Sequence, residues 1–254
     1  MPNKTTVPVL MGVSMALLAL PVVGTFRAGL RNDSPPPAES AADGRRCAGH
    51  VALTFDDGPT PLTPQILDIL DEHGARAAMF NLGSAALEHP EQVEAQLAAG
   101  HAVENHSQNH ADLTTLDPEA IAAEIIEANE TLRAAGADPQ WFRPPYGYTD
   151  DRVKAAVATA GLREVIWTTD TFDWEDGPVS DVVDKALAVE PGGIILMHDG
   201  KQRTVDALPA ILDGLAERGL CAGQIVESAE THHPSGWPDN TYQAVAGPWD
   251  NAAA

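Results

Sequence analysis

The sequence predicts an α/β fold built on a parallel sheet, and three observations support this. Six short runs recur along the chain, each apolar enough to form a strand buried on both faces. Stretches with helical spacing of apolar residues lie between and after these runs. A glycine directly follows five of those stretches, where a left-handed residue commonly ends a helix. Strand and helix alternating in this way indicate a parallel sheet, either open or closed into a barrel.

The individual elements follow from these patterns. We expect strands at residues 51–55, 77–80, 101–103, 141–142, 165–167 and 194–197. Helices are expected at residues 63–73, 90–99, 118–135, 151–160, 179–189 and 205–218, and the closing glycines are Gly74, Gly100, Gly136, Gly161 and Gly219. Asp117 is the expected N-cap of the helix at 118–135, and Pro118 then occupies its first position.

Composition and charge limit the functional classes. The chain has 254 residues, with 15 basic and 37 acidic side chains, which gives a net charge of −22. Nucleic acid is therefore excluded as an expected partner, because binding the phosphate backbone requires a basic surface. The hydrophobic content of 44% is high enough for a sizeable core, in one large α/β domain or two small ones.

The two ends of the chain differ from its middle. Residues 7–24 carry no charge, which is typical of an export signal or a membrane anchor, so residues 1–24 should meet the export machinery or the membrane. We therefore expect a secreted, extracellular protein, or one anchored by this segment. Residues 25–46, with three consecutive prolines at 35–37, are expected to form a linker, and 47–227 the domain. Residues 228–254 are a polar tail expected to lie on the surface.

The two cysteines lie near the two ends of the expected domain. Export would place Cys47 and Cys221 in an oxidising compartment, where a disulfide between them would join those ends. The alternative is a pair of buried thiols.

Polar residues lie at the ends of four of the expected strands. They are Asp56 and Asp57, Asn105 and His106, Arg143, and His198 and Asp199. Because the carboxyl ends of parallel strands share one rim, where ligands bind, these side chains should converge.

A metal site is the first hypothesis for this rim. His106 and His110 are four residues apart, so both imidazoles can face one ion, and Asp57 is the natural third ligand. Two histidines and one carboxylate leave a coordination position for water, as in hydrolytic metal centres. The alternatives are surface histidines, and the facial triad of iron oxygenases, which an alternating βα pattern suits poorly.

An acid and a base are the second hypothesis. If Asp57 binds the metal, its neighbour Asp56 can accept a proton from the water, while His198 donates a proton to the leaving group. A simple turn at Asp56-Asp57-Gly58-Pro59 and a half-buried His198 are the structural alternatives.

Five segments of the chain together resemble a known family. They are Thr54-Phe55-Asp56-Asp57-Gly58-Pro59, His106-Ser107-Gln108-Asn109-His110, Arg143-Pro144-Pro145-Tyr146-Gly147, Asp170-Thr171-Phe172-Asp173-Trp174 and Leu196-Met197-His198-Asp199. In this order they are similar to the five motifs of the polysaccharide deacetylases with a NodB homology domain, carbohydrate esterase family 4. The resemblance extends from about Cys47 to Val226, and its nearest counterparts are secreted actinobacterial chitin or peptidoglycan deacetylases and acetylxylan esterases.

The resemblance implies a fold and a set of roles. The fold would be a distorted (β/α) barrel of the NodB type, a single catalytic domain with parallel strands. Asp57, His106 and His110 match the metal ligands, usually for zinc, with cobalt or nickel also productive. Asp56 matches the catalytic base, and His198 matches the acid.

The same resemblance assigns supporting and substrate-binding residues. Arg143 matches the arginine that keeps the base ionised, and Asp173 the carboxylate that raises the pKa of His198. The backbone amide of Tyr146 would stabilise the oxyanion. Pro145, Tyr146, Trp174 and Leu196 would line a groove for a sugar and its acetyl group, with core packing as the alternative for Trp174.

The function expected from this reading is metal-assisted removal of acetyl groups from a polysaccharide or oligosaccharide by a monomeric enzyme. N-deacetylation of a polymer that contains N-acetylglucosamine, such as chitin or peptidoglycan, is the first expectation. O-deacetylation of acetylxylan by the same residues is the alternative, and a catalytically inactive carbohydrate-binding barrel is a more remote one.

Overall fold

The computed structural model describes residues 47–228 and 244–249 of the chain. The predicted export segment 1–24 and linker 25–46 lie outside these residues. No helix in the described part is long and apolar enough to cross a membrane.

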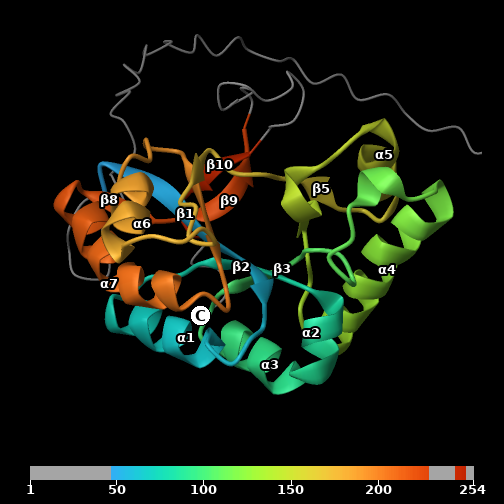
Figure 1. Cartoon of the computed structure of the whole chain (residues 1–254), viewed down its shortest axis with the longest axis horizontal. Helices are drawn as coiled ribbons and strands as arrows, with labels where there is room; N and C mark the ends of the chain where they lie inside the picture. The colour runs from blue at the N-terminus through green and yellow to red at the C-terminus, as the bar shows by residue number, and fades with distance from the viewer. Residues whose placement is uncertain (1–46, 229–243, 250–254) are drawn as a thin grey trace, which may run out of the picture. The chain divides into compact units, whose positions relative to one another are not determined.

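Eight strands in this part form one parallel sheet (Figure 1). β1 (Gly49–Gly58) lies between β2 (Ala78–Asn81) and β7 (Ile194–His198). The other strands are β3 (Ala102–Asn105), β4 (Trp141–Phe142), β5 (Arg163–Glu164), β6 (Thr169–Asp170) and β8 (Leu220–Ala222). Their order is β5-β4-β3-β2-β1-β7-β6, and β8 pairs with the start of β1. The predicted α/β class and parallel strands are confirmed.

The two end strands, β5 and β6, do not pair with each other within the described residues, and residues 165–168 connect them. At one end of this connection the Val165 N–H donates to the Phe142 carbonyl in β4, and at the other the Thr168 N–H donates to the Ile194 carbonyl in β7. Residues 165–167 belong to this connection and not to a strand, so the predicted strand at 165–167 is wrong. Val165 and Ile166 are fully buried, which explains their apolar character, but the Ile166 carbonyl accepts a hydrogen bond from the Arg143 guanidinium rather than from a strand.

The two faces of β1 have different surroundings because successive side chains point to opposite sides of a strand. Val51, Leu53 and Phe55 belong to the largest apolar cluster, which also contains helix residues. Ala52 belongs to a second cluster that includes Phe80 and Ile194. Because side chains alternate along the strand, Thr54 and Asp56 lie on the same face of β1 as Ala52. The Asp56 side chain therefore projects from a buried face of β1 at the rim.

Helices follow most of the strands. They are α1 (Thr63–Glu72), α2 (Gly83–Glu88), α3 (Pro90–Ala98), α4 (Pro118–Ala134), α5 (Asp151–Thr159), α6 (Val179–Ala186) and α7 (Gln202–Glu217). Six of them match the predicted helices to within three residues at each end. α2 was not predicted, because its 6 residues are too few to show a helical period. α6 packs beside α7, and α4 beside α5 (Figure 1).

The predicted helix ends are confirmed. All five closing glycines have positive φ, between 60° at Gly74 and 94° at Gly136. The Asp117 side chain accepts a hydrogen bond from the Ala120 N–H, as expected of an N-cap.

The tail differs from expectation in its described part. Ala244–Gly247 forms β10, which pairs antiparallel with β9 (Gln224–Glu227). Ala244 and Ala246 are buried in the same cluster as Ile225 and Phe80. These small apolar residues therefore extend the core, which a generally polar composition concealed.

The structure contains the predicted disulfide. Cys47 and Cys221 are bonded, with their Cα atoms 5.6 Å apart. Since His50 pairs with Cys221 in the β1–β8 ladder, the bond lies where the first and eighth strands meet.

We predict that this bond contributes measurably to stability. It closes a loop with a sequence separation of 174 residues. Loss of such a loop constraint costs about 5 kcal/mol at most in the chain-entropy model. The variant with both Cys47→Ser and Cys221→Ser should melt at a lower temperature than the parent protein. Thiol titration of the unreduced, denatured parent should find no free thiol, and two free thiols would contradict the prediction.

Candidate active site

The predicted convergence at the strand ends is confirmed. Asp56 and Asp57 are near the end of β1, His106 directly follows β3, and His198 ends β7. Asp56 and His198 are direct neighbours in the β1–β7 ladder. Three segments separated by long stretches of chain thus supply polar side chains to one rim.

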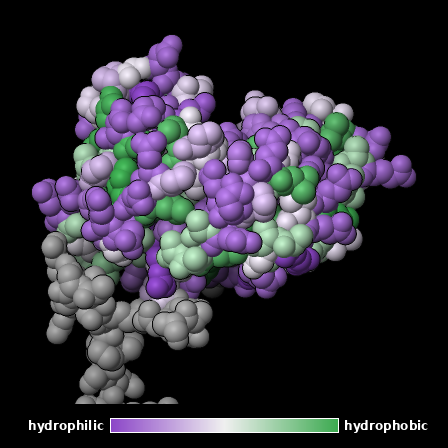
Figure 2. Space-filling model, turned by 90° about the horizontal axis from the view of Figure 1, so that it is seen from below, coloured by the Kyte–Doolittle hydropathy of each residue, from purple (hydrophilic) through white to green (hydrophobic). Residues whose placement is uncertain are grey.

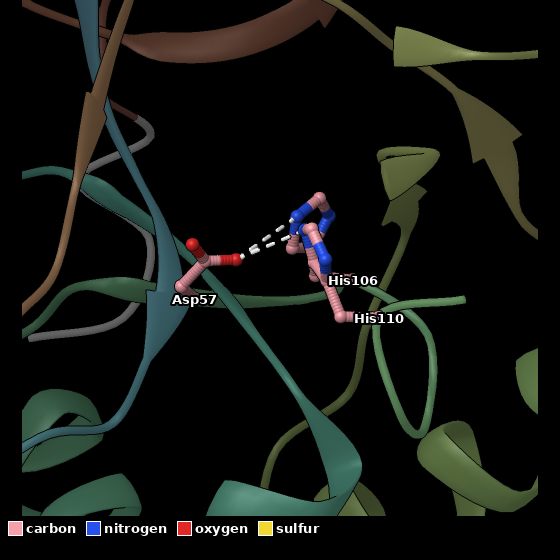
Figure 3. Close-up of side chains that lie close together, drawn as sticks. All are labelled: Asp57, His106 and His110. Carbon is pink, nitrogen blue, oxygen red and sulfur yellow. Dashed lines mark ion pairs between the residues drawn. The ribbon is translucent and has the colours of Figure 1, made fainter. Parts of the chain in front are cut away.

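Asp57, His106 and His110 form a compact cluster (Figure 3). Their ligand atoms all lie within 4.8 Å of one another. Asp57 Oδ1 is 3.5 Å from His106 Nε2 and 3.2 Å from His110 Nε2. The predicted metal-binding residues are therefore brought together.

Local backbone geometry turns these side chains toward each other. A register irregularity between Asp56 and Gly58 interrupts the β1–β2 ladder, and Asp57 has a φ of 70°. Ser107 and His110 also have positive φ, at 70° and 58°. Non-glycine residues in this region are strained, and such strain is often found at functional sites.

Hydrogen bonds hold the loop that carries the two histidines. Asn105 Oδ1 accepts from the Ser107 N–H, and Ser107 Oγ accepts from the His110 N–H. The Glu124 carboxylate on α4 accepts from the N–H groups of Gln108 and Asn109 and from the Asn109 side chain. These contacts offset the strained backbone and fix the direction of the imidazoles.

The donor set fits a divalent cation. His106 Nδ1 donates to the Arg143 carbonyl at 2.7 Å, so a neutral His106 directs the lone pair of Nε2 toward Asp57. Asp57 Oδ1 is buried and has no hydrogen-bond partner. Two acceptor atoms facing each other at this distance repel unless a cation lies between them. Two nitrogens and one oxygen are a common set for zinc and related ions.

Electrostatics favour the metal-binding forms of Asp57 and His110. Burial favours a neutral Asp57, but the nearby His106 and His110 outweigh it and lower the pKa of Asp57 to about 2. Burial lowers the pKa of His110, which favours its neutral, metal-binding form.

Asp56 is held by a buried arginine. Arg143 is fully buried, and its Nη1 lies 2.7 Å from Asp56 Oδ1 and donates also to Thr54 Oγ1. Nη2 donates to the Ile166 carbonyl, and the guanidinium carbon lies 4.1 Å above the centre of the Phe80 ring. Asp56 Oδ2 points to the metal cluster, 3.7 Å from His106 Nε2.

His198 is held by a second buried carboxylate. His198 Nδ1 lies 2.7 Å from Asp173 Oδ1, and the His198 N–H donates to Asp173 Oδ2. Thr204 Oγ1 also donates to Asp173. Burial opposes protonation of His198, but the bond to Asp173 outweighs it and raises the pKa of His198.

The predicted groove residues divide into two pairs. Tyr146 and Trp174 are 54% and 51% exposed, which rules out core packing for Trp174. Pro145 is buried and Leu196 is 3% exposed, so either could touch a substrate over only a small area.

Comparisons with known proteins agree with this geometry. Residues 43–165 match the family described as polysaccharide deacetylase. A chitooligosaccharide deacetylase of Sinorhizobium fredii is 37% identical over 203 residues, which are 73% of this chain and 93% of that protein. The chain belongs to the polysaccharide deacetylase family.

Two further members extend the comparison. A bifunctional xylanase/xylan deacetylase of Cellvibrio japonicus is 34% identical over 185 residues, which are 72% of this chain and 28% of that protein. The solved structure of a family 4 carbohydrate esterase from Streptomyces lividans in complex with acetate has a TM-score of 0.71 and 37% identity. The match covers 80% of this chain and 99% of that one. This likeness confirms the distorted (β/α) barrel that the motifs implied.

Several supporting residues of this polysaccharide deacetylase were not predicted. Thr204 and Glu124 contact Asp173 and the histidine loop from distant parts of the chain, and no local motif marks them. Thr54 lies in the first of the five motifs, but its contact with Arg143 was not predicted. Asp199 was noticed only as a strand-end residue. Its carboxylate accepts from Thr60 Oγ1 and Thr63 Oγ1 and so fixes the loop after β1.

The two adjacent aspartates should respond differently to loss of charge. Asp57→Asn removes an anionic ligand and should weaken Zn²⁺ binding by more than about 10-fold. Asp56→Asn is the matched control, because its amide oxygen can still accept from Arg143, and its Zn²⁺ affinity should stay near that of the parent. Calorimetric titration of Zn²⁺ into chelator-treated protein measures both. Equal losses in the two variants would mean that the pair is assigned wrongly.

Proposed function

We propose that this protein is a metal-dependent hydrolase that removes acetyl groups from a polysaccharide. The observation that carries the proposal is that the Asp57–His106–His110 cluster shares one rim with two side-chain pairs. These are Asp56 with Arg143 and His198 with Asp173, and Asp56 is the ladder partner of His198. This arrangement provides metal ligands, a base and an acid at one rim.

Asp57, His106 and His110 would hold the metal, which we propose is Zn²⁺, with Co²⁺ or Ni²⁺ as substitutes. When bound, such an ion supplies Lewis-acid polarisation of a carbonyl oxygen and makes water more acidic.

Asp56 is proposed as the general base. Its Oδ1 is engaged by Arg143, so Oδ2, which faces the metal cluster, is the oxygen that would accept a proton from the attacking water. Arg143 keeps the carboxylate in place and next to a permanent positive charge. The developing oxyanion of the acetyl group would accept a hydrogen bond from the Tyr146 N–H.

His198 is proposed as the general acid. Asp173 binds Nδ1, so Nε2 is the atom that would give its proton to the departing nitrogen or oxygen. The raised pKa of His198 favours the protonated form that this role requires. An amine leaving group depends on this proton more than an alcohol does, because an amine anion is a very poor leaving group.

The proposed substrate is an N-acetylglucosamine polymer, such as chitooligosaccharide, chitin or peptidoglycan. The chitooligosaccharide deacetylase relative supports this choice. The xylan deacetylase relative supports O-deacetylation of acetylxylan as a second candidate, since the same base and acid serve an ester. An inactive sugar-binding barrel would not need the Asp56–Arg143 and His198–Asp173 pairs that this chain retains.

We also propose that the protein acts outside the cell, as a monomer, and is either secreted or anchored by residues 1–24. The uncharged run at 7–24 and the Cys47–Cys221 disulfide support export. Fractionation of cells that express the full chain tests this, and a protein found only in the cytoplasm would contradict it.

The function is tested by measuring acetate release from chitooligosaccharides, peptidoglycan and acetylxylan, before and after treatment with a chelator. We expect release from the N-acetylated sugars, loss after chelation and recovery with Zn²⁺. Release must occur without oxygen or a keto acid, which separates a hydrolase from an iron oxygenase. Full activity in the chelated protein, or no release from any substrate, would reject the proposal.

The pH dependence of activity should follow the His198–Asp173 pair. Because Asp173 raises the pKa of His198, the acid keeps its proton as the pH rises, and activity is lost above that pKa. Asp173→Asn removes the charge and should move the alkaline limb of kcat/KM to lower pH. Asp176→Asn removes an exposed charge from the same loop and should leave the limb in place. An unchanged limb in Asp173→Asn would exclude His198 as the titrating acid.

A further inference from the structure

Exposed aromatic side chains gather at the rim of the site. Among the described residues, the exposed large hydrophobic side chains include four aromatic ones, and all four follow β4 or β6: Tyr146, Tyr148, Phe172 and Trp174. The face of the molecule drawn in Figure 2 is mainly hydrophilic, with separate hydrophobic patches. Exposed aromatic area of this kind is unfavourable in water and commonly marks a binding surface.

The rings after β4 form a row that leads away from the metal cluster. The Tyr146 ring is 4.5 Å from the His110 ring, and the Tyr148 ring is 5.7 Å from the Tyr146 ring, tilted by 36°. Tyr148 is 55% exposed. Tyr146 therefore borders the reacting centre, and Tyr148 extends the aromatic surface beyond it.

The rings after β6 lie differently. Phe172 and Trp174 are 5.9 Å apart, but the Lys185 ammonium lies 4.4 Å over the Phe172 ring and covers one of its faces. Phe172 therefore has only one ring face that is not covered by Lys185. Tyr148 has no such covering cation among the described residues, and its ring is the better platform for a ligand.

The chemistry of this platform fits a neutral sugar. Aromatic rings pack against the apolar C–H face of a pyranose, and the phenol hydroxyl can exchange hydrogen bonds with its hydroxyl groups. With a net charge of −22, the chain does not favour a polyanion.

We propose that Tyr148 binds the sugar unit next to the one that loses its acetyl group, and so makes the enzyme select chains over single sugars. This inference rests on the proposed deacetylase function. Tyr146 then contacts the reacting sugar, and Tyr148 contacts its neighbour on the β4 side of the site.

The test compares kcat/KM for acetate release from N-acetylglucosamine and from its β-linked tetramer. In Tyr148→Ala, the ratio of tetramer to monomer should fall about 10-fold, the order expected from loss of one stacking contact. Tyr148→Phe keeps the ring and should keep the ratio. Ile126→Ala, which truncates an exposed side chain on α4, should change neither value.

A binding measurement separates this proposal from the deacetylase function itself. Calorimetric titration of the tetramer into Asp56→Asn, with and without Tyr148→Ala, needs no turnover and should show about 10-fold weaker binding without the ring. An unchanged ratio and unchanged binding in Tyr148→Ala, or equal losses in Tyr148→Phe, would overturn the role of the ring. If the parent binds the tetramer through Tyr148 but releases no acetate from any sugar, only the deacetylase function fails.

Discussion

The ion pair between Arg143 and Asp56 is the interaction on which the rest of the site depends. Both side chains are almost completely buried, and removing two charges from water is costly unless the pair is close and its remaining donors are bonded. Thr54 and the Ile166 carbonyl accept hydrogen bonds from the guanidinium, and the Phe80 ring packs on it, which offsets part of that cost. Arg143 Nε is buried without a hydrogen-bond partner. Because Arg143 follows β4 while Ile166 lies in the connection from β5 to β6, the same contacts fix the irregular backbone that joins the two ends of the sheet. The Arg143 carbonyl also orients His106, so one residue organises both the base and a metal ligand.

The site assigns different tasks to similar groups through their surroundings. Asp56 and Asp57 are adjacent, yet the interruption after β1 directs Asp57 to the two imidazoles while Asp56 stays with the arginine. His106 and His198 differ in the same way: the first faces a backbone carbonyl and is suited to bind metal as the neutral ring, and the second faces a carboxylate that favours its proton. The β1–β7 register sets Asp56 beside His198, so a base and an acid can act on the same acetyl group.

The sequence was sufficient for features that depend on local patterns. Glycines ended the helices, Asp117 capped α4, and polar residues at strand ends indicated the rim. The strand predicted at 165–167 failed because burial and strand pairing are different properties: Ile166 is buried, but its carbonyl serves a side chain. The contribution of Glu124 was missed because it braces the histidine loop from a helix fifteen residues further along, and β10 was missed because two small buried alanines leave little signal.

The central claim is that Asp56 acts as a base and does not serve as a ligand. The most direct measurement is the kcat of Asp56→Asn for acetate release, made on protein shown to carry as much metal as the parent. General-base catalysis typically contributes about 10²- to 10⁴-fold, so kcat should fall by that order while KM changes little. A metal-loaded Asp56→Asn protein with nearly normal kcat would contradict the account.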